Sequence, residues 1–496
     1  MNLTKLALIS LGLSPLGASS PIETSPEPLN IALSSTFGSR SHIKYLFEIA
    51  QHLRNRGHNI IYAAPQGNFK FNKPYNYTEY DIGGVIHNTR DLMKTFDIEE
   101  MIKDSMKIMS KHFTNITTYY YEETFNNYEK FYKSQKIDLI ICDFFSPVCI
   151  DSARKSGVPL IGGFQGLSFG VGSAPFITNT MDSSPTTTES LSFYQRFKQA
   201  VIDPLKMIYD FSDFANKMNE ARKKFGVPQV PNPFGAFDEI MKISNTYIGF
   251  DEPRPISSTL KLVGPVMDDY IPQLGEDLQS FLDSHKSMYV AFGSAAVLNE
   301  RILKKLASSM QLAIDSGAVE GVLWGLGNTN HEDFPKTYEV NGHTYSTKSI
   351  LDGTHPYIKA LSWAPQTAIL NHQNTKLFIS HGGIESSHEA IHSGTPILLM
   401  PMFGDQPRNA RLIKNRGIGD FVDTLTATPH DLLEKIKDLT REDNYILQDK
   451  VKHIQSISHD RNSMRENNAK FIENYAISAK ICRKSHHKNL LRLLAN

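Results

Sequence analysis

The feature that most constrains this chain is a strand, a short loop, a helix and a second strand in direct succession. Residues 30–35 are an apolar strand pattern, and residues 43–53 place apolar side chains three and four apart, as one face of a helix does. Gly57 ends the helix, and residues 59–64 form the second strand. Such a unit builds a parallel sheet through a right-handed crossover. The sequence therefore predicts an α/β fold.

The same alternation returns further along the chain and predicts two domains. Strand patterns recur at 137–143 and 159–164, and a second block of strands and helices begins near residue 262. A chain of 496 residues is also too long for one compact domain. Two doubly wound α/β domains that face each other place ligands at the carboxyl ends of their strands, in the cleft between them. The predicted units are an N-terminal domain (27–252), a linker (253–265), a C-terminal domain (262–440) and a terminal helix (443–475) that packs back toward the N-terminal domain.

The N-terminus has the order of a secretory signal peptide. Lys5 precedes an apolar run at 6–13, and small residues follow at 17–20. We predict a signal peptide over 1–20; the alternative is a ragged start to the first domain. Acceptor sequons for N-glycosylation occur at Asn76 and Asn115. The longest apolar runs are shorter than the 18 residues typical of a transmembrane segment. The prediction is a protein of the secretory pathway, in the endoplasmic reticulum lumen or secreted, without a transmembrane segment.

Composition excludes some classes of protein. The 52 basic and 52 acidic residues give no net charge, so nucleic acid is not a predicted partner. The three cysteines lack metal-ligand spacing; Cys142 and Cys149 lie in apolar surroundings and are predicted to be buried thiols, with a disulfide as the alternative. No Asp-x-Asp pair suggests a divalent ion, so no metal is expected. The tail over 480–496 mixes basic residues with leucines and could contact a membrane surface as an amphipathic helix, although a frayed end is the simpler interpretation.

The segment from Trp363 to Asn409 contains the strongest chemical pattern. Gly382 and Gly383 lie between a strand and a helix, where they let backbone N–H groups approach a ligand closely. The N-terminus of the helix that follows suits a diphosphate. Trp363 offers a flat face on which a base can stack, and the Glu389 carboxylate can accept both hydroxyls of a ribose. Each residue alone fits an ordinary strand–turn–helix, but the whole run predicts a nucleotide-sugar site.

This run resembles the donor-binding signature of the UDP-glycosyltransferase superfamily (glycosyltransferase family 1), and the signal peptide suggests the secretory type of animals and fungi. The resemblance implies the GT-B architecture, in which two Rossmann-like doubly wound domains face a central cleft. It also implies that Trp363 stacks on uracil, that Gln366 and Glu389 hold the ribose, and that Asp405 and Gln406 read the sugar. The full predicted donor set is Gly293, Ser294, Trp363, Ala364, Gln366, His381, Gly383, Glu385, Ser386, Glu389, Asp405 and Gln406, of which His381, Gly383 and Ser386 hold the diphosphate.

One position departs from the family pattern. Many family members have Asn where this chain has Glu385. A carboxylate at a helix N-terminus beside a diphosphate would repel the donor unless its side chain turns away. The sequence therefore leaves open whether Glu385 weakens donor binding or changes the sugar preference.

The catalytic pair is expected in the N-terminal domain. His42 begins the first helix, whose dipole is expected to lower the histidine pKa and keep the ring neutral, so that it can accept a proton from an acceptor hydroxyl. Asp143 ends a nearby strand and could orient the imidazole; Asp151 is the rival. Taken alone, His42 could equally be a surface or capping residue. The aromatic side chains of Phe144 and Phe164 are assigned to the acceptor pocket.

These features together predict an inverting glycosyltransferase that needs neither metal nor another cofactor. It would move a hexose, with glucose the first choice, from a UDP-sugar to a hydroxyl of a small lipophilic acceptor. Two alternatives are a sugar-nucleotide epimerase on the same fold and a non-catalytic protein that binds UDP-sugars.

Overall fold

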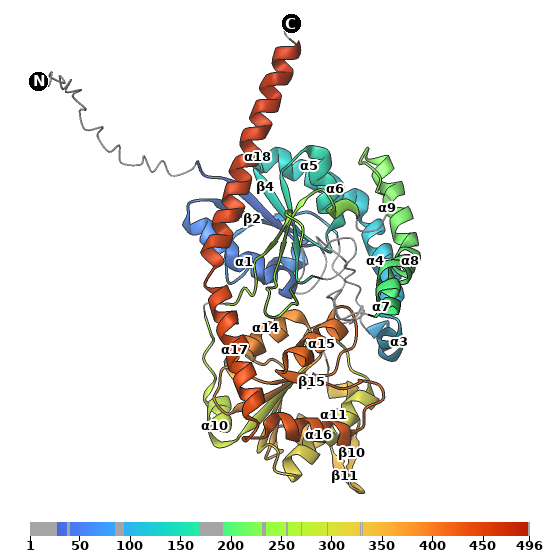
Figure 1. Cartoon of the computed structure of the whole chain (residues 1–496), viewed down its shortest axis with the longest axis vertical. Helices are drawn as coiled ribbons and strands as arrows, with labels where there is room; N and C mark the ends of the chain where they lie inside the picture. Colours follow the sequence, from blue (N-terminus) through green and yellow to red (C-terminus); the bar gives the residue numbers. More distant parts are fainter. Residues whose placement is uncertain are drawn as a thin grey trace, which may run out of the picture.

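The computed structural model describes residues 27–36, 40–84, 94–167, 192–230, 235–253, 256–268, 270–294, 296–327, 329 and 331–494. The predicted signal peptide over 1–20 lies outside these residues. Two α/β units, each built on a parallel sheet, lie one above the other in Figure 1, the N-terminal unit in blue to green and the C-terminal unit in yellow to red. Within the described part of the chain, no helix is long and apolar enough to cross a membrane.

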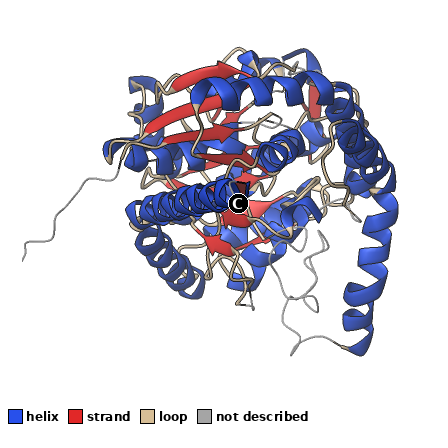
Figure 2. Ribbon diagram, turned by 90° about the horizontal axis from the view of Figure 1, so that it is seen from above, coloured by secondary structure: helices blue, strands red, loops and turns tan. Residues whose placement is uncertain are grey.

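The N-terminal sheet has seven parallel strands in the order β3-β2-β1-β4-β5-β6-β7. The order reverses between β1 and β4, as in a doubly wound Rossmann-like sheet, and ligands bind at such a reversal. Side chains of β1 alternate between two core clusters, Ile31 and Leu33 in one and Ala32 in the other, because both faces of the sheet are covered by helices (Figure 2). The strands are β1 (Asn30–Ser34), β2 (Asn59–Ala64), β3 (Thr78–Asp81), β4 (Leu139–Asp143), β5 (Leu160–Phe164), β6 (Met241–Ser244) and β7 (Leu260–Leu262).

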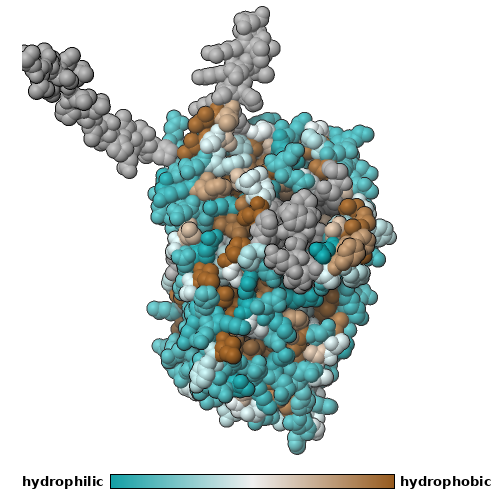
Figure 3. All heavy atoms as spheres, viewed as in Figure 1, coloured by the Kyte–Doolittle hydropathy of each residue, from teal (hydrophilic) through white to brown (hydrophobic). Residues whose placement is uncertain are grey.

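Three helices of this domain follow one another closely along the chain. Residues 193–224 form three α-helices with a π-helical turn between the first two. Phe193, Leu205 and Tyr209 are exposed there, and hydrophobic side chains gather at the right edge of Figure 3, beside the site of these helices in Figure 1. The helices are α1 (Arg40–Asn55), α3 (Ile98–Lys103), α4 (Ser105–Tyr119), α5 (Tyr121–Gln135), α6 (Pro147–Ser156), α7 (Phe193–Phe197), α8 (Asp203–Asp210) and α9 (Ser212–Lys224).

The predicted boundary of the N-terminal domain at residue 252 is wrong. Strand β7 pairs with β6 and adds Leu260–Leu262 to the N-terminal sheet, so the stretch predicted as a linker contributes to the domain. Only Leu260 and Leu262 are buried in this strand, while Lys261 is exposed. Three residues are too few for the apolar alternation to stand out in a sequence.

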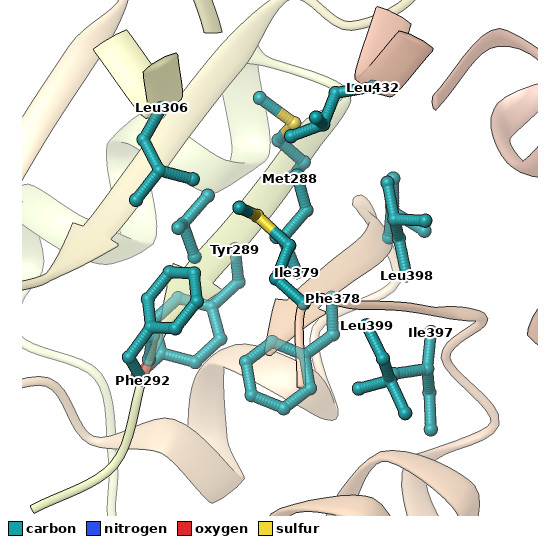
Figure 4. Packing of buried hydrophobic residues seen from close by; sticks show 14 of the residues in the cluster. Met288, Tyr289, Phe292, Leu306, Phe378, Ile379, Ile397, Leu398, Leu399 and Leu432 are labelled. Carbon is teal, nitrogen blue, oxygen red and sulfur yellow. The ribbon is translucent and has the colours of Figure 1, made fainter. Parts of the chain in front are cut away.

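The C-terminal sheet has six parallel strands in the order β12-β9-β8-β13-β14-β15. In its core, Met288 and Tyr289 of β8 pack with residues of β13 and β14, the two strands that follow β8 in the sheet (Figure 4). Residues 337–346 form a separate antiparallel hairpin, β10 (Thr337–Val340) and β11 (His343–Ser346), which buries Tyr338. The sheet strands are β8 (Ser287–Ala291), β9 (Gly321–Gly325), β12 (Ile358–Leu361), β13 (Thr375–Ser380), β14 (Ile397–Leu399) and β15 (Gly419–Phe421), and the helices are α10 (Glu276–Ser284), α11 (Glu300–Asp315), α12 (Lys348–Leu351), α13 (Gln366–Leu370), α14 (Ile384–Ser393), α15 (Gln406–Arg416) and α16 (Pro429–Thr440).

The C-terminal segment returns to the N-terminal domain. The single helix predicted over 443–475 is two helices, α17 (Tyr445–Asn462) and α18 (Arg465–Leu494). In α18, Glu473 accepts hydrogen bonds from Arg56 at 2.6 Å and from His58 at 2.9 Å, and both partners follow α1. The end of the chain is helical to Leu494 rather than frayed (Figure 1).

The prediction of two buried thiols is wrong in one respect. Cys142 and Cys149 are both buried, but they form a disulfide whose Cα atoms lie 5.9 Å apart. Cys142 belongs to β4 and Cys149 to the first turn of α6, so the strand–helix turn between them brings the two side chains together. The two cysteines are seven residues apart in the sequence, a spacing that does not by itself indicate a contact between them.

Candidate active site

His42 and Asp143 come together at the carboxyl ends of neighbouring parallel strands. His42 lies in the first turn of α1, directly after the β1 loop, and Asp143 is the last residue of β4. The His42 Nδ1 atom lies 3.3 Å from Asp143 Oδ1. The other carboxylate oxygen, Oδ2, accepts the backbone N–H of Phe145 at 3.0 Å, which fixes the carboxylate. This geometry orients the ring so that its Nε2 can face a reacting group.

The expected direction of the His42 pKa shift is wrong. Burial acts most strongly and lowers the pKa of His42, but the carboxylates around the ring, Asp143 first among them, together raise it above its usual value. Asp405 and Glu385, both from the C-terminal domain, add to the rise. The helix dipole alone predicted a lower pKa because these three carboxylates are far from His42 in the sequence.

Asp151, the rival orienting residue, has a structural partner. Both of its carboxylate oxygens accept from Arg222 Nε, at 2.9 and 3.1 Å, and Tyr121 donates to it at 3.0 Å. Asp151 and Arg222 are almost completely buried in the N-terminal core. The structure therefore brings Asp143, and not Asp151, to His42.

The aromatic residue beside His42 is Phe145, which follows the predicted Phe144 in the sequence. Phe145 places its ring centroid 5.0 Å from that of His42, and Phe113 packs against Phe145 at 5.4 Å. Phe164 is buried in the core, and Phe144 packs against it and Phe237. The turn after β4 points its second phenylalanine, Phe145, toward His42. The assignment of Phe144 and Phe164 to an acceptor pocket stays a prediction.

In the C-terminal domain, the β13–α14 turn surrounds a histidine with glycine backbone. His381 follows β13, and its ring lies against Gly383 and against Gly293, which follows β8. A Cβ atom on Gly293 would lie 2.8 Å from the ring, and one on Gly383 only 2.5 Å from it. Burial lowers the pKa of His381 to about 4, so its ring is neutral at physiological pH and carries a single N–H. Ser294 follows Gly293 in the same loop.

A second group of polar side chains lies along α13 and α14. Gln366 Nε2 donates to Glu389 at 2.5 Å and to Ser386 Oγ at 3.1 Å, so these three predicted residues meet. Tyr289 donates to Gln366 Oε1 at 3.3 Å. Trp363 is 80% exposed, which leaves its ring available for stacking. Ala364 packs in the space above Gly325.

The β14–α15 loop holds the remaining predicted residues. Asp405 accepts a hydrogen bond from Asn409 at 2.7 Å, and the same amide donates to Gly382 O at 2.9 Å, which joins this loop to the glycine turn. Burial raises the pKa of Asp405. The side-chain oxygen of Gln406, Oε1, accepts from the backbone N–H groups of Met402 and Phe403. Its side-chain nitrogen, Nε2, is therefore the atom that can donate to a ligand.

Lys44 is a site residue that sequence reasoning missed. It belongs to α1, two residues after His42, yet its Nζ reaches Glu385 at 3.1 Å and Glu389 at 3.2 Å on α14 of the other domain. It also pairs with Asp268 at 3.2 Å. The α1 pattern marks Lys44 only as one polar position on an amphipathic helix. The Glu385 side chain, whose effect on donor binding the sequence left open, is directed to this ammonium.

Comparison with known proteins identifies the family. A sequence model described as "UDP-glucoronosyl and UDP-glucosyl transferase" matches residues 172–485, which is more than half of the chain. The chain belongs to this family of UDP-glycosyltransferases. The match includes the glycine turn, Glu389 of α14 and the β14–α15 loop described above. The chain is therefore an enzyme that transfers a glycosyl group from a UDP-sugar, as predicted.

Relatives support the assignment over most of the chain. The UDP-glycosyltransferase stmC of Aspergillus ustus is 24% identical over 429 residues, which cover 83% of this chain and 80% of that protein. The UDP-glucuronosyltransferase 1A6 of Oryctolagus cuniculus is 24% identical over 450 residues, covering 85% of this chain and 78% of the relative. The solved structure of a kitacinnamycin glycosyltransferase superposes with a TM-score of 0.63 at 16% identity and covers 90% of this chain and 99% of its own. The predicted GT-B fold class is confirmed by such structures.

Proposed function

We propose that this UDP-glycosyltransferase moves a hexose, with glucose the leading candidate, from its UDP-sugar to a hydroxyl of a small lipophilic acceptor. The reaction proceeds with inversion and without a metal ion. The observation that carries the proposal is the His42–Asp143 pair at 3.3 Å, set on the N-terminal domain and influenced electrostatically by Asp405 and Glu385 of the donor-binding domain. This position suits a catalytic base that works between an acceptor side and a donor side.

In this proposal His42 acts as the general base. Its Nδ1 is held by Asp143, so Nε2 accepts the proton of the acceptor hydroxyl while that oxygen attacks the anomeric carbon. The bond from the anomeric carbon to the diphosphate oxygen breaks, and its electron pair leaves with UDP. A single displacement inverts the anomeric centre. The Asp143 carboxylate stabilises the imidazolium that forms, in keeping with the raised pKa of His42.

The departing diphosphate gains negative charge, and backbone groups can stabilise it. The N-terminus of α14 begins just after Gly383, where a helix offers N–H groups and a positive dipole end. Neutral His381 can add one N–H from beside the same turn. These groups take the place of a divalent cation in the proposal, which is why no metal is required.

The sugar and the acceptor contact different loops. Asp405 can accept from sugar hydroxyls, and the Gln406 amide nitrogen can donate to one, which suits a neutral hexose such as glucose. On the acceptor side, the rings of Phe145 and Phe113 give an apolar surface next to His42. A lipophilic molecule with one hydroxyl near that surface fits this arrangement.

The donor site can be tested without knowing the acceptor. Titration of the folded protein with UDP and UDP-glucose should raise its thermal stability, by about 2.7 kcal/mol at a hundred times the dissociation constant. AMP and GDP serve as controls and should give little response, because the family uses UDP-sugars as donors. The same titration in EDTA is expected to give the same stabilisation. Absence of a response to millimolar UDP would contradict the proposal.

We further propose that the protein matures in the secretory pathway, in the endoplasmic reticulum lumen or beyond it. The buried Cys142–Cys149 disulfide is typical of an oxidising compartment, and the sequon residues Asn76 and Asn115 are both exposed. Expression in a secretory eukaryotic cell should yield a protein that begins after the predicted signal peptide and shifts in mass on deglycosylation. An unprocessed N-terminus at Met1 together with no change in mass would argue against this localisation.

A further inference from the structure

The two domains are joined at the donor site by a cation from the N-terminal domain and carboxylates that face it. Lys44 Nζ lies 3.1 Å from Glu385 Oε1, 3.2 Å from Glu389 Oε1 and 3.2 Å from Asp268 Oδ2. The Lys44 side chain is 7% exposed, so water screens these pairs only weakly. The carboxylates hold the pKa of Lys44 well above its usual value, and the group stays charged.

Glu385 and Glu389 sit one helical turn apart on α14 and repel each other. Burial raises the pKa of Glu389, and the Glu385 charge acts in the same direction, while Lys44 opposes both effects. Glu389 has further partners, since Gln366 donates to it at 2.5 Å and Thr367 at 3.4 Å. Among the described residues, Lys44 is the cation that pairs with Glu385, at 3.1 Å, and Arg40 adds an attraction through space. Lys44 therefore matters more to Glu385 than to Glu389.

Glu385 lies in the first turn of α14, the helix end that the proposed function assigns to the diphosphate. An unbalanced carboxylate there would oppose the charge of the ligand and the helix dipole that attracts it. With Lys44 at 3.1 Å, the Glu385 charge is balanced and its side chain is held toward α1. The same contact ties α1, which carries His42, to α14.

We propose that Lys44 is a positioning residue of the donor site: it balances the charge of Glu385 and fixes α1 against α14, so that a diphosphate can bind next to His42. This inference rests on the proposed function, because it assumes that UDP binds at α14. It explains how a chain with Glu at position 385 retains a usable donor site. Lys44 acts through Glu385 and does not itself touch the reacting atoms.

The test compares UDP and uridine binding to the full chain by calorimetry. Lys44→Met should weaken UDP binding by at least about tenfold, because the Glu385 charge is left unbalanced beside the diphosphate. Uridine lacks phosphate, so its affinity should fall much less in this variant. Glu385→Asn alone should tighten UDP binding a few-fold by removing the same charge. The double variant Lys44→Met/Glu385→Asn should regain UDP affinity to within about threefold of wild type, a non-additivity expected of paired side chains.

Lys44→Arg is the matched control, since it keeps the positive charge and should stay close to wild type in UDP affinity. Melting temperatures without ligand show whether each variant is folded. Equal losses of UDP and uridine in Lys44→Met, with no recovery in the double variant, would overturn the inference and leave Lys44 a purely structural residue. Failure of the wild type to bind UDP is a different result: it removes the proposed donor site, and the inference with it.

Discussion

Replacement of His42 by alanine is expected to lower kcat by about 10³-fold, within the range that general base catalysis contributes. In the proposed mechanism the ring accepts the proton of the acceptor hydroxyl, and its Nδ1 lies 3.3 Å from Asp143 Oδ1. UDP binding should change little, because the predicted donor contacts lie on the C-terminal domain. The measurement is steady-state turnover of UDP-glucose with an accepted acceptor, beside calorimetric titration with UDP.

Asp143→Asn gives a second and more specific readout. The Asp143 carboxylate raises the pKa of His42, and the base works only in its neutral form. The wild-type rate should therefore rise with pH through a pKa above 6.5, the usual value for histidine. Without the carboxylate the histidine loses its proton more easily, so the acid limb should move to lower pH even though the maximal rate falls. The slower variant should thus keep a larger share of its own maximal rate at acidic pH.

Asp151→Asn separates this effect from general damage to the domain. Asp151 is a buried carboxylate of the same domain that pairs with Arg222 instead of His42. Its loss should reduce stability without moving the acid limb of the surviving activity. If Asp143→Asn leaves the pH profile in place, or if His42→Ala retains full turnover, His42 is not the base and Asp143 does not tune it.

The two α/β domains could be predicted because strands that are buried on both faces appear in the sequence as continuous apolar runs. Strands β1 and β4 are wholly or almost wholly buried, and both fall within the predicted ranges. Strands β3, β7 and β15 were missed because each has only three or four residues and exposes part of them. The domain boundary was wrong for the same reason. An alternating apolar pattern can be recognised only over several residues, and these short strands have too few.

Site residues could be predicted from the sequence where they share one turn. They could not be predicted where contacts between distant parts of the chain bring them together. Gly382, Gly383 and Glu389 belong to one strand–turn–helix, so their neighbourhood follows from the sequence. The salt bridge between Lys44 and Glu385 joins side chains 341 positions apart, since 385 − 44 = 341, and no local pattern encodes it. The raised pKa of His42 likewise depends on carboxylates from β4, α14 and the β14–α15 loop. Charge balance in this site is a property of the assembled domains.

Gly293→Ala is expected to raise the dissociation constant of UDP by about a hundredfold, or roughly 2.7 kcal/mol. Gly293 has φ of +68°, a left-handed conformation that costs other residues about 1–2 kcal/mol. The new Cβ would also lie 2.8 Å from the His381 ring, which has Gly383 on another side. The ring must then shift into the turn where the diphosphate is expected to bind. Calorimetric titration with UDP measures the loss.

Gly317→Ala provides a control in the same domain with almost the same backbone strain. Its φ is +71°, and a Cβ added there meets nothing within 4 Å. Both variants should lose stability in thermal melts because both adopt the left-handed conformation, and Gly293→Ala should lose more because its Cβ also meets the His381 ring. Only Gly293→Ala should lose UDP affinity, since only there does the side chain displace His381. Equal UDP affinity in the two variants would show that the His381 ring and its glycine surroundings are not part of the donor site, and would move the diphosphate away from this turn.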